Sequence, residues 1–133
     1  MGTYPTNKMG YAGPDYCIVR ESLIPHPAAD SNAAADTKQA AYTSWCKGKL
    51  LGARAVIGTA GTATTAGFTI KVGTTSVGTI VCGTTAALGA VEGTITATAF
   101  SKGGTVNAHN INSDDGLVAD IFLLWERTFD ESE

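Results

Sequence analysis

Charged side chains are scarce in this sequence of 133 residues: Asp, Glu, Lys and Arg make up 16% of it, and the formal net charge is -3. The chain therefore lacks the basic stripe that a nucleic-acid-binding surface needs, and we expect no nucleic-acid partner. Interfaces between subunits are depleted in charge, and so a charge-poor surface is easiest to understand if other subunits cover much of it. The composition favours an oligomer or an assembly.

Cysteine pairs and long apolar runs are also missing. Cys17, Cys46 and Cys82 are widely spaced and form no C-x-x-C pair. We interpret them as small buried hydrophobic residues rather than as metal or redox ligands. No stretch approaches the roughly 18 apolar residues of a membrane span, and no signal peptide is apparent at the N-terminus. We expect no membrane partner and folding in a reducing cytoplasm.

Catalytic and cofactor motifs are absent as well. The glycine-rich runs contain neither the phosphate-binding pattern G-x-x-x-x-G-K-[ST] nor G-x-G-x-x-G, and H-E-x-x-H does not occur. Ser113 and Asp114 near His109 lie in a turn, without a nucleophile elbow. The same turn fails as a calcium loop, because Asp115 and Ile121 stand where glycine and glutamate are required. We expect no enzyme activity, no cofactor and no metal.

Threonine and glycine are abundant instead, above all in residues 58 to 104. There they separate isolated apolar residues, a pattern typical of strands joined by tight turns. In GFTIKVGTTSVGTIVCGT, the apolar Phe68, Ile70 and Val72 fall on one face of a strand, and the sequence GTTS then reverses the chain. This segment predicts a β-hairpin.

Seven segments follow such a pattern, with turn signals every 8 to 12 residues or so. They predict one mainly-β domain over residues 17–129, an antiparallel β-sandwich that is jelly-roll-like or, as an alternative, immunoglobulin-like. Residues 28–45 leave two alternatives open, a short helix near Asp36 or a long surface loop. The predicted strands are Cys17–Ile24, Leu50–Ile57, Phe68–Val72, Val77–Cys82, Val91–Phe100, Thr105–Ile111 and Leu117–Phe129.

The last predicted strand, LVADIFLLWERTF, differs from the others because both of its faces are largely apolar. In a strand with one solvent-exposed face, apolar and polar residues should alternate. Because this strand is apolar on both faces, we expect it to lie centrally. The sandwich core would cover one of its faces. The chain's own loops or a second subunit would cover the other.

The N-terminal end of the sequence contains several tyrosines, whereas the C-terminal end is acidic. Residues 1–16 have no strand or helix period but contain Tyr4, Tyr11 and Tyr16. They are either a frayed terminus or an extended arm that lies on a neighbour, for which tyrosine supplies large contact area. Residues 130–133 form an acidic tail, which serves solubility or meets a charged partner surface.

From Lys49 to Phe129 the order of segments is KLLGARAVIGTA, the hairpin described above, VEGTITATAF, a corner at Gly103 and Gly104, and LVADIFLLWER. This order resembles the small β-sandwich decoration proteins, also called cement or head-fibre proteins, of tailed-bacteriophage capsids. Residues 1–48 lie outside the resemblance.

The resemblance implies a structural virion protein without enzyme activity, commonly a homotrimer, that is made in the host cytoplasm. It would bind the major capsid protein on the capsid exterior and bridge capsomers. The alternative is a phage tail, host-surface or glycan-binding module, for which Tyr42 and Trp45 are the candidate aromatics. We expect the tyrosine-bearing arm to contact the capsid or a neighbour. The candidate subunit interface consists of apolar residues of the last strand: Leu117, Ile121, Phe122, Leu124 and Trp125.

Overall fold

The computed structural model describes residues 18–24, 35–112 and 116–128, and within these residues the regular structure consists of strands alone. No helix long and apolar enough to cross a membrane occurs in this part of the chain. The strands are β1 (Ile18–Ile24), β2 (Lys38–Thr43), β3 (Gly48–Thr59), β4 (Gly67–Val72), β5 (Thr75–Val81), β6 (Ala90–Glu92), β7 (Thr94–Ile95), β8 (Thr98–Phe100), β9 (Thr105–Asn110) and β10 (Val118–Arg127).

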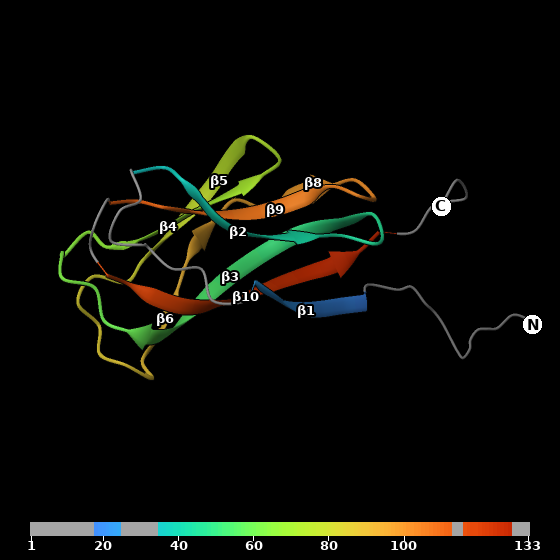
Figure 1. The fold of residues 1–133 in the computed structure, drawn as a ribbon. Coiled ribbons are helices and arrows are strands. Elements are labelled where there is room, and N and C mark those ends of the chain that lie inside the picture. The colour runs from blue at the N-terminus through green and yellow to red at the C-terminus, as the bar shows by residue number, and fades with distance from the viewer. Residues whose placement is uncertain (1–17, 25–34, 113–115, 129–133) are drawn as a thin grey trace, which may run out of the picture.

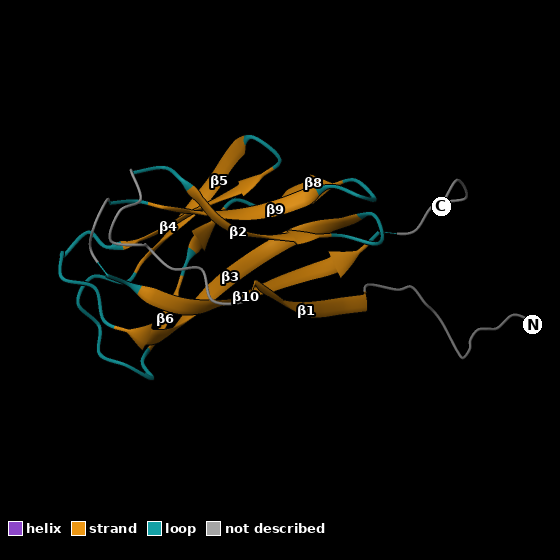
Figure 2. Cartoon of the chain, in the orientation of Figure 1, coloured by secondary structure: helices purple, strands orange, loops and turns teal. Residues whose placement is uncertain are grey.

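The strands form two antiparallel sheets that pack face to face (Figures 1 and 2). One sheet has the order β1-β10-β3-β6, with β8 also paired to β3, and the other has the order β2-β9-β4-β5-β7. The predicted antiparallel β-sandwich is therefore confirmed, whereas its jelly-roll or immunoglobulin-like topology stays a prediction. Strand β10 lies between β1 and β3, and so the central position expected for the last strand is also confirmed.

The core lies between the sheets and is built from alternate residues of each strand. Trp125 of β10 is 4% exposed and meets the Phe100 ring edge-on, with the ring centroids 5.4 Å apart. Its indole Nε1 donates a hydrogen bond to Ser22 Oγ over 2.9 Å, which satisfies the one polar atom of the buried ring. Cys82 is buried as expected, and Cys46 packs half-buried against the core. Cys17 lies outside the described residues.

Residues 28–45 contain the strand β2, whereas the sequence predicted a short helix or a long surface loop there. Residues 38–43 form neither a helix nor a loop but pair with β9. Asp36 does not act as a helix N-cap, which needs an extended backbone, since its φ of 59° is left-handed. The pairing partner lies about 70 residues later in the chain, and such a contact overrides local helix propensity. Residues 25–34 lie outside the described part.

The segment predicted as one strand from Val91 to Phe100 forms three short strands instead. β6 and β8 pair with β3, whereas β7 between them pairs with β5 of the other sheet. The chain crosses at Gly93, where a Cβ would lie 2.7 Å from Ile80 Cγ1 and 3.1 Å from the Ala53 carbonyl oxygen. Only glycine fits this crossing, which joins the two sheets along one side of the sandwich.

Candidate functional site

The outer face of the β1-β10-β3 sheet is shaped by a β-bulge in β3. Leu124 of β10 pairs with Gly52 and Trp125 pairs with Leu50, so Leu51 has no opposite residue. The extra residue shifts the alternation, and Leu51 and Gly52 both border the outer face although they are neighbours in the sequence. Bulges of this kind re-aim side chains, and here the bulge brings a leucine next to the outward residues of β10.

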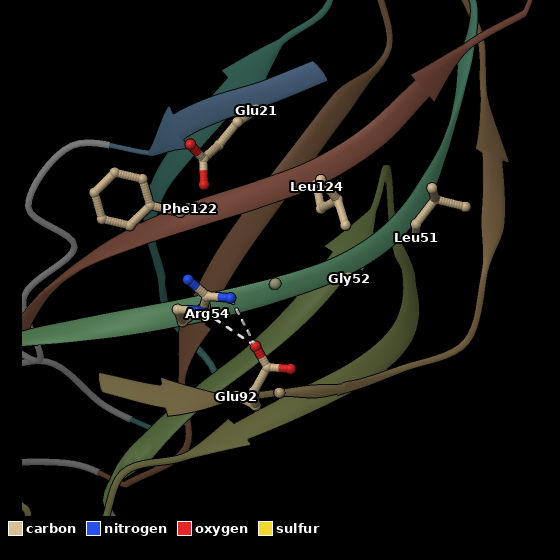
Figure 3. A pocket seen from close by; sticks show the side chains of 9 residues that line it. Glu21, Leu51, Gly52, Arg54, Glu92, Phe122 and Leu124 are labelled. Carbon is tan, nitrogen blue, oxygen red and sulfur yellow. Dashed lines mark hydrogen bonds and ion pairs between the residues drawn. The ribbon is translucent and has the colours of Figure 1, made fainter. Parts of the chain in front are cut away.

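A shallow hollow of about 230 Å³ lies on this face (Figure 3). Its apolar walls are Phe122, Leu124 and Leu51, and Gly52 leaves its floor open because a Cβ there would have no heavy atom within 4 Å. Leu124 is 44% exposed and Phe122 is half-buried. A hollow with apolar side chains on the central strands of a sheet and charged side chains around them is a candidate contact surface.

Charged residues border the hollow on two sides (Figure 3). Arg54 of β3 pairs with Glu92 of β6, with 3.1 Å between Arg54 Nη2 and Glu92 Oε2. Both side chains are more than half exposed, and such a pair contributes about 0 to 1 kcal/mol. Glu21 of β1 lies across the hollow, opposite Leu124 in the register. Among the described residues Glu21 has no ionic partner, and so the hollow carries an uncompensated negative charge.

The structure divides the five residues of the candidate subunit interface between two faces. Leu117, Ile121 and Trp125 are 0 to 4% exposed and belong to the subunit's own core, and so they cannot contact a neighbour. This corrects their assignment, and the reason is the two-residue period of a strand, which sends alternate residues to opposite faces. Phe122 and Leu124 lie on the outer face and stay candidates for the interface. Tyr4, Tyr11 and Tyr16 lie outside the described residues.

Apart from Phe122 and Leu124, none of the residues that line the hollow was among the sequence candidates. Leu51 and Gly52 reach the hollow through the bulge, and Glu21 reaches it by pairing with a strand about 100 positions away. The double leucine in KLLGAR is the one signal that could have indicated an outward residue, because Leu50 and Leu51 cannot both face the core of a regular strand.

A second exposed apolar feature lies at the end of the sandwich where β3 begins. Trp45 is 89% exposed and borders a hollow of about 330 Å³ together with Lys102. The loop that carries it is held by Ser44, whose N–H donates to the Gly104 carbonyl over 2.9 Å and whose carbonyl accepts from the Gly103 N–H over 2.8 Å. Tyr42 is half-buried and packs against Trp125 at 6.4 Å between centroids. The pair expected for a glycan platform therefore has one of its rings turned to the core.

A cluster of Asp36, Lys71 and His109 ties the start of β2 to the neighbouring strands. Lys71 Nζ lies 3.0 Å and His109 Nδ1 lies 3.3 Å from Asp36 Oδ1. The hydrogen bond from Lys71 is the largest of the causes that lower the pKa of Asp36 below its ordinary value of 3.8. No group of three or more His, Cys, Asp or Glu residues in the described part of the chain could hold a metal ion. The cluster stabilises the β2 end.

This cluster predicts a pH-dependent contribution to stability. Because the folded-state pKa of Asp36 is lowered, the ionised carboxylate stabilises the fold above pH 3.8, and this contribution is lost as the pH falls through the folded-state pKa. Asp36→Asn keeps a residue that tolerates the left-handed backbone but removes the charge. We expect the variant to unfold at lower urea concentration than the parent protein at neutral pH, and the difference to vanish in acid. A difference that persists unchanged in acid would contradict the assignment.

Fold and surfaces together define a β-sandwich with one hollowed sheet face and one protruding tryptophan. The chain matches no protein-family model, and comparisons with curated protein sequences and with solved structures give no significant match.

Proposed function

We propose that the protein is a structural virion protein that decorates the exterior of a tailed-bacteriophage capsid, and that copies of it associate through the outer face of the β1-β10-β3 sheet. The observation that carries this proposal is the exposure of Leu124 beside Phe122 on the outer face of a central strand. In an isolated subunit these two side chains would leave apolar surface of a central strand in contact with water. A covering subunit explains both.

Burial of this face would stabilise an assembly by removing apolar surface from water. Each square ångström of apolar surface removed from water contributes about 25 cal/mol. One such contact is weak, but joining three copies makes the attachment of the second and third copies to the capsid intramolecular. A protein that binds only the assembled shell stabilises that shell by mass action. The major capsid protein would be the partner, and the site of action would be the outside of the virion.

Attachment to capsids tests this function. Leu124→Asp places a charge on the proposed contact face without touching the core, because Leu124 is 44% exposed. We expect the variant to attach to undecorated heads at least tenfold more weakly than the parent protein in a sedimentation assay, because loss of the trimer removes avidity. Thr79→Asp, at an exposed position of β5 in the other sheet, is the matched control and should attach normally. If the parent protein itself does not attach to heads, the decoration function is wrong.

A further inference from the structure

Two of the exposed apolar features in the described part of the chain differ in shape and in charge. The first is the hollow of about 230 Å³ walled by Phe122 and Leu124, with the carboxylate of Glu21 at its rim. The second is Trp45, which protrudes from the end of the sandwich with the ammonium of Lys102 beside it. The sheet-face hollow carries the uncompensated negative charge of Glu21, whereas Trp45 is 89% exposed to solvent and has the positive charge of Lys102 beside it. The two features are complementary.

The Trp45 end is built to present a side chain. Two backbone hydrogen bonds tie Ser44 to the loop that contains Lys102, and Ser44 Oγ accepts a third from the Cys46 N–H over 3.2 Å. The loop is therefore ordered before any partner arrives, which lowers the entropy cost of binding. Tryptophan is the residue most enriched among those that dominate binding energies at protein interfaces. Trp45 and Lys102 thus form a preorganised aromatic and cationic knob.

The size of the hollow suits this knob. A cavity of roughly 150 Å³ holds a benzene ring, and so a hollow of about 230 Å³ has room for the larger indole ring. Leu88 is equally exposed, at 87%, and is the alternative knob. Its loop binds the far end of β3 through Ile57, and the residues on either side of Leu88, from 84 to 91, carry no cation to pair with Glu21. Charge complementarity favours Trp45.

We infer that a second copy of this chain fills the hollow, with its Trp45 against Phe122 and Leu124 and its Lys102 beside Glu21. The knob lies at one end of the sandwich and the hollow on a sheet face, and so the contact joins two different surfaces, head to tail. Contacts of this type close into rings where the rotation between copies allows it and otherwise form filaments, whereas a two-fold dimer would pair one surface with itself. The inference rests on the proposed function, since it specifies how the copies of that assembly meet.

Mixing two variants, each of which lacks one half of the proposed contact, tests this arrangement. Trp45→Ala keeps the hollow but loses the knob, whereas Gly52→Phe keeps the knob and fills the hollow. We expect each variant alone to be a monomer in sedimentation equilibrium. An equimolar mixture has one intact knob and one intact hollow, and so it should form dimers of about 27 kDa, twice the 13.6 kDa of the chain, and no ring. Leu88→Ala is the matched control and should assemble like the parent protein.

Reversal of the charges at Glu21 and Lys102 tests the same contact without a Gly52→Phe substitution. Glu21→Lys alone should weaken the assembly several-fold, and adding Lys102→Glu in the same chain should restore it, because the ion pair is then inverted. A Trp45→Ala protein that still assembles, or a mixture that contains no dimers, would overturn the head-to-tail contact. In that case loss of assembly in Leu124→Asp would still support the outer face as the interface, whereas a monomeric parent protein would contradict the proposed homotrimer itself.

Discussion

Trp125→Ala is expected to lower the free energy of unfolding by about 3 to 5 kcal/mol, the range for removing a buried tryptophan. Trp125 is 4% exposed, contacts Phe100 and Tyr42, and donates a hydrogen bond to Ser22. Truncation leaves a cavity between the sheets and removes the partner of the Ser22 hydroxyl. A domain of this size is stable by about 5 to 15 kcal/mol, and so the variant should lose a large share of its stability.

Urea denaturation followed by circular dichroism measures this loss without relying on the fluorescence of the removed residue. Trp45→Ala is the matched control, because it removes the same side chain from a position that is 89% exposed. At a dilution at which the parent protein is itself a monomer, we expect that control to change the unfolding free energy by less than about 0.5 kcal/mol. Equal effects of the two substitutions would contradict the placement of Trp125 in the core and Trp45 at the surface.

Gly52→Phe is expected to convert the assembled protein into monomers. The backbone of Gly52 is not in the left-handed region, a Cβ there meets no heavy atom within 4 Å, and the adjoining hollow of about 230 Å³ gives space for the ring. The phenyl ring then occupies the hollow that a neighbouring copy would fill. Aromatic residues suit strands, and so no loss of stability is expected from the backbone.

Sedimentation velocity distinguishes this effect from unfolding. Thr79→Phe adds the same ring to the exposed face of the other sheet and should leave the assembly intact. Both variants should show the circular dichroism spectrum of the parent protein. A Gly52→Phe protein that folds and remains assembled would show that the hollow is not part of the subunit interface.

The fold could be predicted from the sequence where the evidence is local. The β4-β5 hairpin follows from alternating apolar residues and from Gly73, whose φ of 63° suits the turn. The central position of β10 follows from its two apolar faces. Strand β2 was missed because its pairing with β9 joins segments far apart in the sequence. The crossing at Gly93 was missed because threonines alternate with apolar residues directly after it, from Thr94 to Ala99, as they would in one continuous strand.

The candidate site could be predicted only in part. Phe122 and Leu124 were found because apolar residues on a second strand face are conspicuous. Leu117, Ile121 and Trp125 were grouped with them because the sequence does not show which of two apolar faces packs inward. Glu21, Leu51 and Gly52 depend on strand order and on a bulge, which arise from tertiary pairing. The exposure of Trp45 depends on a loop whose hydrogen bonds reach residues 103 and 104.

The mass of the unmodified protein in solution, measured by light scattering over a range of concentrations, tests the central claim most directly. The claim is that the outer face of the β1-β10-β3 sheet joins copies of this chain into a trimer. We predict a mass of about 41 kDa, three times the 13.6 kDa of one chain, that falls toward the monomer mass on dilution. A mass of 13.6 kDa at every concentration would contradict the claim.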